Sequence, residues 1–327
     1  MDFKNIFNQF NNKRILVIGD VMIDAYILGA VTRVSPEAPV PIVNFQKSEN
    51  RLGGAANVAL NLVALGAKPV ICSVIGKDSM AKVMLDLIEN SGVDASGVIT
   101  SDDRLTTVKT RVIGNKQQLI RIDQEEVKEL VQKELDAVYT QIEKIVQSGV
   151  DAIIFEDYNK GVLVPELIAK VVELANKYQI PTTVDPKKDH FLAYQGVTLF
   201  KPNLKELREG LDMHVSFDSP QFQEAVLKLE EKLQNKISFI TLSELGVFIK
   251  DENQSFHIPA HLRNITDVSG AGDTVISVAT LCLSVGLPIE LIGAISNIAG
   301  GLVCEKNGVV SIDKEDLLNE TIKLLGK

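Results

Sequence analysis

The stretch DVSGAGDTV, residues 267–275, places glycines and a carboxylate directly before a mostly apolar run. Gly270 and Gly272 allow close backbone approach, and a helix that starts here would aim its free N–H groups at the loop. Such an arrangement forms an anion site. Asp273 could then act as a base beside a bound phosphate or simply cap a buried helix. Short glycine motifs often occur by chance, so both readings stay open at this point.

Two further clusters lie near the N-terminus. Asp20 and Asp24 in GDVMID follow the first strand candidate, where carboxylates accept hydrogen bonds from hydroxyl groups or close a turn. Gly53 and Gly54 are expected to open a helix that carries Asn57 on its first turn. Paired glycines either permit tight packing or let a sugar approach the backbone, and Asn57 offers both a donor and an acceptor.

The segment KPNLKEL, residues 201–207, enters a predicted helix after a strand. Asn203 and Glu206 lie three residues apart near that helix start, so they share one face. They could form a capping box. Alternatively, they could hold Mg²⁺ and its phosphates through water, because Mg²⁺ prefers oxygen ligands and keeps several waters.

Short β-branched runs alternate with longer segments of helical periodicity along the chain. This pattern is typical of βα units that build a parallel sheet, so the fold class is α/β. Ligands bind beyond the carboxyl ends of strands in such sheets, and several of these runs end in carboxylates or amides. The strand candidates are residues 14–20, 69–76, 151–157, 181–186, 197–203 and 237–242.

Residues 25–46 and 106–123 break this alternation. Both segments have a near period of two with turn signals, which predicts hairpins of a small antiparallel sheet that stands off the main one. Since no long linker separates the parts, residues 1–327 are expected to form one domain. An apolar face on the small sheet predicts a homodimer formed through it. Its candidate residues are Val31, Val40, Ile42, Val112 and Ile120.

Composition excludes several classes of protein. The chain has 327 residues, 45% of them hydrophobic, with a net charge of -9 and a pI near 5.1. Such an acidic chain is a poor partner for nucleic acid or an anionic membrane. The first residues do not resemble a signal peptide, and three scattered cysteines fit neither a metal site nor a disulfide framework, so a cytoplasmic location is expected. The absence of G-x-G-x-x-G after the first strand argues against a dinucleotide-dependent oxidoreductase.

Three motifs in this order along the chain resemble the ribokinase-like (PfkB) carbohydrate kinases from end to end. They are Gly53-Gly54 with Asn57, then Asn203-x-x-Glu206, then Asp267 to Asp273. This resemblance implies a mainly parallel central sheet flanked by helices, with a small β-sheet lid. It also implies ATP and Mg²⁺, and transfer of the γ-phosphoryl group to a sugar hydroxyl. Asp273 matches the catalytic base of that family, and the backbone of Gly270, Ala271 and Gly272 matches its anion hole.

The resemblance implies roles for other residues as well. For Asn297 and Gly300, helix packing is the alternative to contact with a flat base. Asn203 and Glu206 would hold Mg²⁺ through water, and a monovalent cation such as K⁺ could bind near Asp267. The implied nucleotide-binding residues are Asn203, Glu206, Thr241, Gly246, Asn297 and Gly300; the implied sugar-binding residues are Asp20, Asp24, Gly53, Gly54, Asn57, Arg111, Arg121 and Lys160.

Within that family, the sequence is similar to the D-glycero-β-D-manno-heptose 7-phosphate kinases. The run from Ser35 to Pro41 is the most specific part of this similarity, which covers residues 19–43, 115–123, 156–161 and 185–191. The similarity implies phosphorylation at C1 to the 1,7-bisphosphate, a precursor of ADP-heptose and lipopolysaccharide. Bifunctional relatives add a nucleotidyl-transferring domain with an H-x-G-H motif, which this sequence lacks, so a single-function kinase is expected. Ala25 and Glu156 depart from the pattern. The alternatives are a kinase for ribose, fructose 6-phosphate or another sugar, and a catalytically silent sugar sensor on the same fold.

Overall fold

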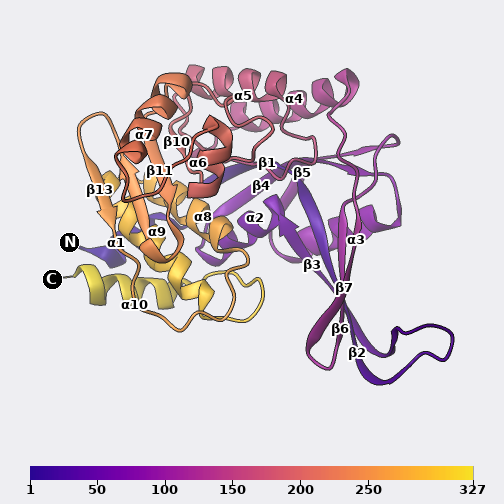
Figure 1. The fold of residues 1–327 in the computed structure, drawn as a ribbon. Helices are drawn as coiled ribbons and strands as arrows, with labels where there is room; N and C mark the ends of the chain where they lie inside the picture. Colours follow the sequence, from indigo (N-terminus) through magenta and orange to yellow (C-terminus); the bar gives the residue numbers. More distant parts are fainter. Residues whose placement is uncertain (327) are drawn as a thin grey trace.

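The structure is a computed structural model that describes residues 1–326. These residues build a nine-stranded sheet with helices on both faces and a separate four-stranded sheet (Figure 1). The strands of the large sheet are β1 (Arg14–Gly19), β4 (Lys68–Gly76), β5 (Asp94–Ser101), β8 (Ala152–Glu156), β9 (Thr182–Asp185), β10 (Leu199–Phe200), β11 (Ile237–Thr241), β12 (Val247–Lys250) and β13 (Ser255–Ile258). Their order in space is β13-β12-β11-β10-β9-β8-β1-β4-β5. The pairs from β11 to β5 are parallel, whereas β12 and β13 join as an antiparallel extension.

All six strand candidates lie in this sheet, which confirms the predicted fold class. Strand β1 shows why the apolar pattern of the sequence predicted these strands. Ile15 and Val17 face one core while Leu16 and Ile18 face the other, because side chains alternate along a strand and both faces are buried. Strands β5, β12 and β13 were not predicted. Strands β5 and β13 are only partly buried, so their apolar pattern is weaker, whereas β12 is largely buried but only four residues long.

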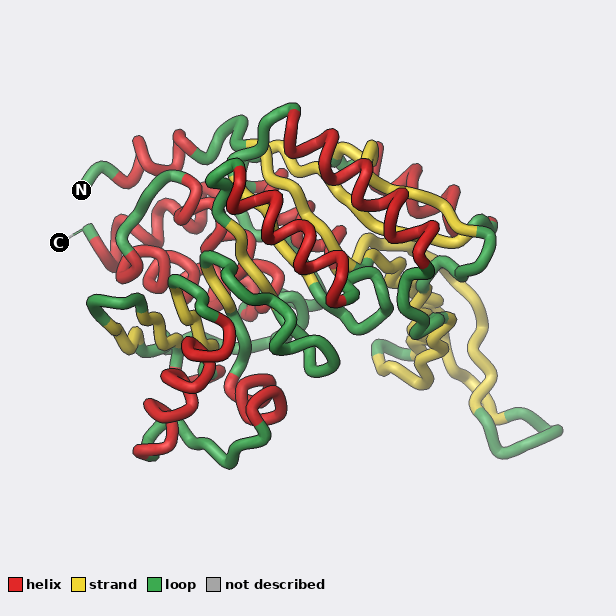
Figure 2. The backbone as a smooth tube through the Cα atoms, turned by 90° about the horizontal axis from the view of Figure 1, so that it is seen from above, coloured by secondary structure: helices red, strands yellow, loops and turns green. Residues whose placement is uncertain are grey.

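Two helical layers cover the sheet, as the view in Figure 2 also shows. One layer contains α1 (Phe3–Gln9), α2 (Ala55–Ala64), α3 (Ser79–Asn90), α8 (Ala271–Ser284), α9 (Ile289–Cys304) and α10 (Lys314–Leu325). The opposite layer contains α4 (Gln132–Gln147), α5 (Pro165–Lys177), α6 (Leu204–Leu211) and α7 (Pro220–Leu233). Among the helices of residues 1–326, none is long and apolar enough to cross a bilayer.

The small sheet contains β2 (Val21–Val34), β3 (Pro41–Gly54), β6 (Val108–Gly114) and β7 (Gln117–Gln124), in the order β3-β2-β6-β7. It projects from the body, and the loop between β2 and β3 reaches farthest out (Figures 1 and 2). The prediction of a purely antiparallel sheet was wrong, because β2 and β6 pair in parallel. Each of these strands continues from a strand of the parallel main sheet, β2 from β1 and β6 from β5, so both leave the same edge in the same direction.

The order of the large sheet places a topological switch point at β1. The chain runs from β1 to β4 and β5 on one side, and later returns to β8 and β9 on the other. Ligands bind beyond the carboxyl ends of the strands at such a point. Three carboxylates lie there: Asp20 directly follows β1, Glu156 ends β8 and Asp185 ends β9.

Candidate active site

Helix α8 begins over this edge, directly after Gly270. Gly270 has a φ of +79°, a left-handed conformation that favours glycine. A Cβ atom at this position would lie 3.2 Å from Nδ2 of Asn57, so a side chain would also disturb that neighbour. Asp273 lies on the first turn of α8 and is only 6% exposed. The glycine turn thus brings the N-terminus of α8 and a buried carboxylate to the same place, although the first N–H group of the helix, that of Ala271, donates to the Val268 carbonyl at 3.3 Å.

The Asp273 carboxylate is held by two other segments of the chain. Nδ2 of Asn57, on α2, donates to Oδ2 at 2.6 Å, and the hydroxyl of Tyr158, in the loop after β8, donates to Oδ1 at 3.0 Å. The carboxylate therefore does not cap its own helix, which was the alternative drawn from the sequence. Burial raises the pKa of Asp273 to about 6, against the lowering effect of the Asn57 hydrogen bond. A fixed carboxylate with this pKa suits a general base near neutral pH.

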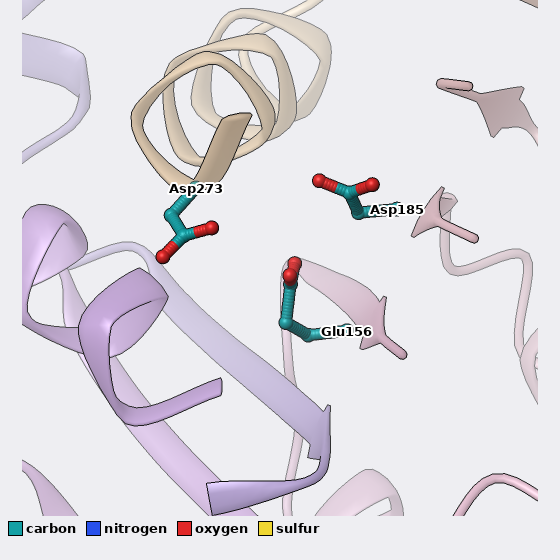
Figure 3. A group of neighbouring side chains, drawn as sticks. All are labelled: Glu156, Asp185 and Asp273. Atoms are coloured by element: carbon teal, nitrogen blue, oxygen red, sulfur yellow. The ribbon is translucent and has the colours of Figure 1, made fainter. Parts of the chain in front are cut away.

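Glu156 and Asp185 lie beside Asp273, and one carboxylate oxygen from each lies within 4.8 Å of the others (Figure 3). Glu156 is fully buried, and neither of its carboxylate oxygens has a hydrogen-bond partner among residues 1–326. Burial raises its pKa well above the ordinary value, and the charges of Asp185 and Asp273 add to this effect. Figure 3 shows its side chain directed toward the space between the two aspartates. Oxygen atoms in this arrangement fit a divalent cation such as Mg²⁺.

Two lysines place positive charge next to this cluster. Nζ of Lys201 lies 2.8 Å from Asp185 and Nζ of Lys187 lies 3.4 Å from it. Burial acts to raise the pKa of Asp185, but the two ammonium groups hold it below its ordinary value. A Cβ atom at Gly272 would lie 3.8 Å from Nζ of Lys201, so the start of α8 faces this charge. Free N–H groups and ammonium groups thus converge beside Asp273, as phosphate binding requires.

Asn203 and Glu206 form a capping box at the start of α6. Oδ1 of Asn203 accepts from the Glu206 N–H at 2.8 Å, and Oε2 of Glu206 accepts from the Asn203 N–H at 2.8 Å. The other Glu206 oxygen accepts from Lys187 at 2.9 Å. An isolated β-bridge also pairs Asn203 with Thr241, so two of the residues that were predicted to bind the nucleotide lie side by side. The capping role is therefore observed, while the contact with Mg²⁺ stays a prediction.

A cavity of about 260 Å³ lies between the small sheet and α2. Asn57 lines this cavity and also binds Asp273, so the cavity adjoins the candidate base. Gly53 makes room for Asp24, since a Cβ atom at Gly53 would lie 2.6 Å from Oδ2 of Asp24. Nη1 of Arg111 donates to the other Asp24 oxygen. The lining residues are Asp24, Tyr26, Arg51, Leu52, Asn57, Leu60, Leu87, Ser91, Val309 and Ser311.

Other residues that were predicted to bind the sugar lie close by, but most of their side chains bind other groups of the protein. Asp20 accepts hydrogen bonds from the backbone N–H groups of Tyr158, Lys160 and Val162, so it positions the loop that carries Tyr158. Gly54, with a φ of +60°, precedes α2 as predicted. Nζ of Lys160 pairs with Glu125 at 2.8 Å. The half-exposed Arg121 pairs with Asp123 on its own strand. Their contacts with sugar stay predictions.

The predicted nucleotide and cation residues lie around α8 and α9. The Asn297 side chain donates to the Pro259 carbonyl at 2.9 Å. Gly300 is buried, and a Cβ atom there would lie 2.9 Å from Val275, which favours the helix-packing reading for this glycine. Asp267 accepts from the Ser269 and Gly308 N–H groups, which lower its pKa. Gly246, with a φ of +91°, forms the turn before β12.

Sequence reasoning missed Tyr158, Asp185 and Lys201 as site residues. Asp185 ends a predicted strand and Lys201 follows another, so the rule on carboxyl ends of strands could have found both. Tyr158 carries no such signal. Only the fold shows that its hydroxyl reaches Asp273.

The sequence is similar to known proteins over most of its length. The family model "pfkB family carbohydrate kinase" matches residues 12–316. The chain is 41% identical over 310 residues to the "Bifunctional protein HldE" of Methylobacillus flagellatus, covering 94% of this chain but 62% of that relative. It therefore spans less than two thirds of the relative's length.

Solved structures give the same fold. Phosphofructokinase-2 from Escherichia coli in complex with potassium superposes with a TM-score of 0.78 at 17% identity, covering 97% of this chain and all of that one. Arabidopsis thaliana ribokinase complexed with ribose and ATP superposes with a TM-score of 0.71 at 16% identity, covering 94% of this chain and 99% of that one. At such identities the likeness establishes the fold alone.

Proposed function

Because the chain belongs to the pfkB family of carbohydrate kinases, and is thus an ATP-dependent sugar kinase, we propose that it phosphorylates C1 of D-glycero-β-D-manno-heptose 7-phosphate. The product would be the 1,7-bisphosphate, a precursor of ADP-heptose and lipopolysaccharide. The observation that carries the reaction is the buried Asp273 carboxylate, which Asn57 and Tyr158 hold beside the cavity. The choice of acceptor rests on the run from Ser35 to Pro41 and on the similarity to HldE.

In the proposed reaction, Asp273 accepts the proton of the sugar hydroxyl as the hydroxyl oxygen attacks the γ-phosphorus, and the bond from the γ-phosphorus to the bridging oxygen breaks so that ADP leaves. The N–H groups from Gly270 to Gly272 and the ammonium groups of Lys187 and Lys201 stabilise the charge of the transferring phosphoryl group. They are fixed in place before the reaction, so they need no reorganisation during it. ATP supplies the phosphoryl group, and Mg²⁺ neutralises charge on its phosphates.

Four residues are proposed to hold Mg²⁺, and a fifth is proposed to lie near a monovalent cation. Glu156 and Asp185 offer buried carboxylate oxygens for Mg²⁺, and the unpaired oxygens of Glu156 support this assignment. Asn203 and Glu206 would contribute through water, as the family motif implies. We also propose a K⁺ ion near Asp267, since the related phosphofructokinase-2 structure is a complex with potassium.

The small sheet is proposed to be a lid within a single kinase domain, and also the contact face of a homodimer. Several apolar side chains on it are exposed, and exposed strand edges invite pairing with a second copy. Of the residues expected on that face, Val40 and Ile120 are 52% and 55% exposed, whereas Val31, Ile42 and Val112 are partly buried. Other exposed apolar side chains of the sheet are Val34, Phe45, Leu119 and Ile122.

We further propose a cytoplasmic location. The cysteines Cys72, Cys282 and Cys304 are free, which suits a reducing compartment.

The deciding experiment is an acceptor panel of heptose, hexose and pentose phosphates and their unphosphorylated sugars. Turnover of ATP is measured with each acceptor, and phosphorus NMR identifies the phosphorylated carbon. We expect the highest kcat/KM with the heptose 7-phosphate and a new signal from a phosphate at C1. A clearly higher kcat/KM with fructose 6-phosphate or ribose would replace the acceptor but retain the sugar kinase, whereas no acceptor-dependent turnover would favour a sugar sensor.

A further inference from the structure

We propose that Arg51 selects acceptors that carry a phosphate, by binding that phosphate within the 260 Å³ cavity. This inference rests on the proposed function and adds a residue that the sequence did not point to. Arg51 lies on β3, directly opposite Asp24 of β2 and two residues before Gly53. Among the described residues that line the cavity, it is the sole basic one. A phosphate inside the cavity therefore has one cationic side chain on the wall around it.

The arrangement of two arginines around Tyr26 supports this role. The guanidinium carbon of Arg51 lies 4.9 Å from the centre of the Tyr26 ring, and that of Arg111 lies 5.5 Å from it. Stacking on an aromatic ring orients a guanidinium group, and its planar fork matches the oxygens of a phosphate. Arg51 reaches the ring from β3 and Arg111 reaches it from β6, on the two sides of the strand that carries Tyr26.

The two arginines differ in how firmly they are engaged. Arg111 binds Asp24, a lining residue of the cavity whose side chain is only 9% exposed, so the guanidinium group of Arg111 is already paired beside the cavity. Arg51 pairs with Glu49 at 2.8 Å on the solvent side, with 48% of its side chain exposed. Glu49 also pairs with Lys47, so it keeps a partner when Arg51 leaves. Exposed ion pairs contribute little, and Arg51 can exchange Glu49 for a substrate phosphate at small cost.

The position of the reacting group fits this assignment. A sugar hydroxyl that reaches Asp273 passes Asn57, which comes from α2. Arg51 reaches the same cavity from the small sheet, and its Nη1 atom lies 3.9 Å from where a Cβ atom of Gly308 would be, next to the lining residue Val309. The reacting hydroxyl and the phosphate are therefore held by different elements. Binding at both ends requires an acceptor with a phosphate away from the reacting carbon.

The test compares Arg51→Gln and Arg51→Lys with the wild type on matched acceptors: heptose 7-phosphate against heptose, and fructose 6-phosphate against fructose. Glutamine keeps much of the side-chain length without the charge, and lysine keeps the charge without the fork. We expect Arg51→Gln to raise KM for the sugar phosphate by about 10- to 100-fold, with a smaller rise for Arg51→Lys. KM for ATP and for the unphosphorylated sugar should not change.

Arg33→Ala is the matched control, since Arg33 is an exposed arginine on the same small sheet. It should leave the preference for phosphorylated acceptors intact, and circular dichroism should give the same spectrum for all variants. If Arg51→Gln retains the wild-type preference, the role of Arg51 is wrong while the proposed acceptor stands. If the wild type uses unphosphorylated sugars as well as it uses sugar phosphates, the proposed acceptor is wrong. The proposed role of Arg51 is then wrong too.

Discussion

The Tyr158 hydroxyl donates a hydrogen bond to Oδ1 of Asp273 at 3.0 Å, although the two residues are 115 positions apart. This bond stabilises the ionised carboxylate and lowers its pKa, against burial, which raises it to about 6. Tyr158 itself stays protonated, because burial first and then the charge of Asp273 raise its pKa well above the ordinary value. The pair therefore sets the pH at which the base becomes available.

Tyr158→Phe should move the acidic limb of the kcat/KM profile to higher pH. A general base works when ionised, so the rate rises with pH through the pKa of Asp273. Loss of the tyrosine hydroxyl raises that pKa, by about one unit for a hydrogen bond to a charged group. The measurement is kcat/KM against pH, with Tyr139→Phe on α4 as the control. An unchanged limb in Tyr158→Phe would show that the hydroxyl does not tune the base.

Glu156→Gln should stabilise the protein at alkaline pH more than at acidic pH. The pKa of Glu156 is raised in the folded state, so the native protein keeps a proton that the unfolded chain releases above its ordinary pKa of 4.5. The free energy of unfolding therefore falls as pH rises from 4.5 toward the pKa of Glu156 in the folded protein. Glutamine does not ionise, so the variant does not lose this stability. Thermal unfolding without divalent cations near pH 4 and near pH 8 checks it. Equal differences in Tm at both pH values would contradict a raised pKa.

Glu206→Gln and Asn203→Ala separate the capping role from the proposed role at the metal. Glutamine can keep the capping box but removes the charge, so Glu206→Gln should raise the Mg²⁺ concentration needed for half-maximal activity with little change in Tm. Asn203→Ala removes the cap, which costs about 1 kcal/mol of stability. Mg²⁺ titrations of activity and thermal unfolding measure both effects. An unchanged Mg²⁺ requirement in Glu206→Gln would leave Glu206 with the capping role and the ion pair with Lys187.

Ile122→Asp should convert the proposed dimer into a monomer. Ile122 is 54% exposed on β7, so a carboxylate there fits a free monomer but would be buried without a partner in the dimer. Sedimentation velocity at micromolar concentration compares it with the wild type. The matched control is Leu227→Asp, because Leu227 is 58% exposed on α7, away from the small sheet. A wild type that sediments as a monomer would contradict the proposal.

The sequence predicted the large sheet well because its strands are buried on both faces. Strand β1, for example, is apolar from Ile15 to Ile18, with a glycine and Asp20 after it. Pairing direction in the small sheet was not predictable from the local pattern. The alternation in β6 is the same for a parallel and an antiparallel neighbour, and the direction follows from how β1 and β5 lie in the main sheet.

The candidate base was predictable because Asp273 is close in sequence to the glycines that position it. Of its neighbours, Asp185 ends a predicted strand and could have been found from that position, whereas Tyr158 could not, because it reaches Asp273 from the loop after β8. Arg51 was missed for a similar reason. Its place on the cavity wall depends on the register between β2 and β3, which aligns it with Asp24.

Asp273→Asn tests the central claim most directly, because asparagine keeps the shape of the side chain but cannot accept the proton at neutral pH. The measurement is kcat with saturating sugar phosphate and ATP, together with the Kd for ATP and the Tm. We expect kcat to fall by about 10²- to 10⁴-fold while the affinity for ATP and the fold are retained. A kcat near the wild-type value, in a folded variant that binds ATP, would contradict the assignment of Asp273 as the base.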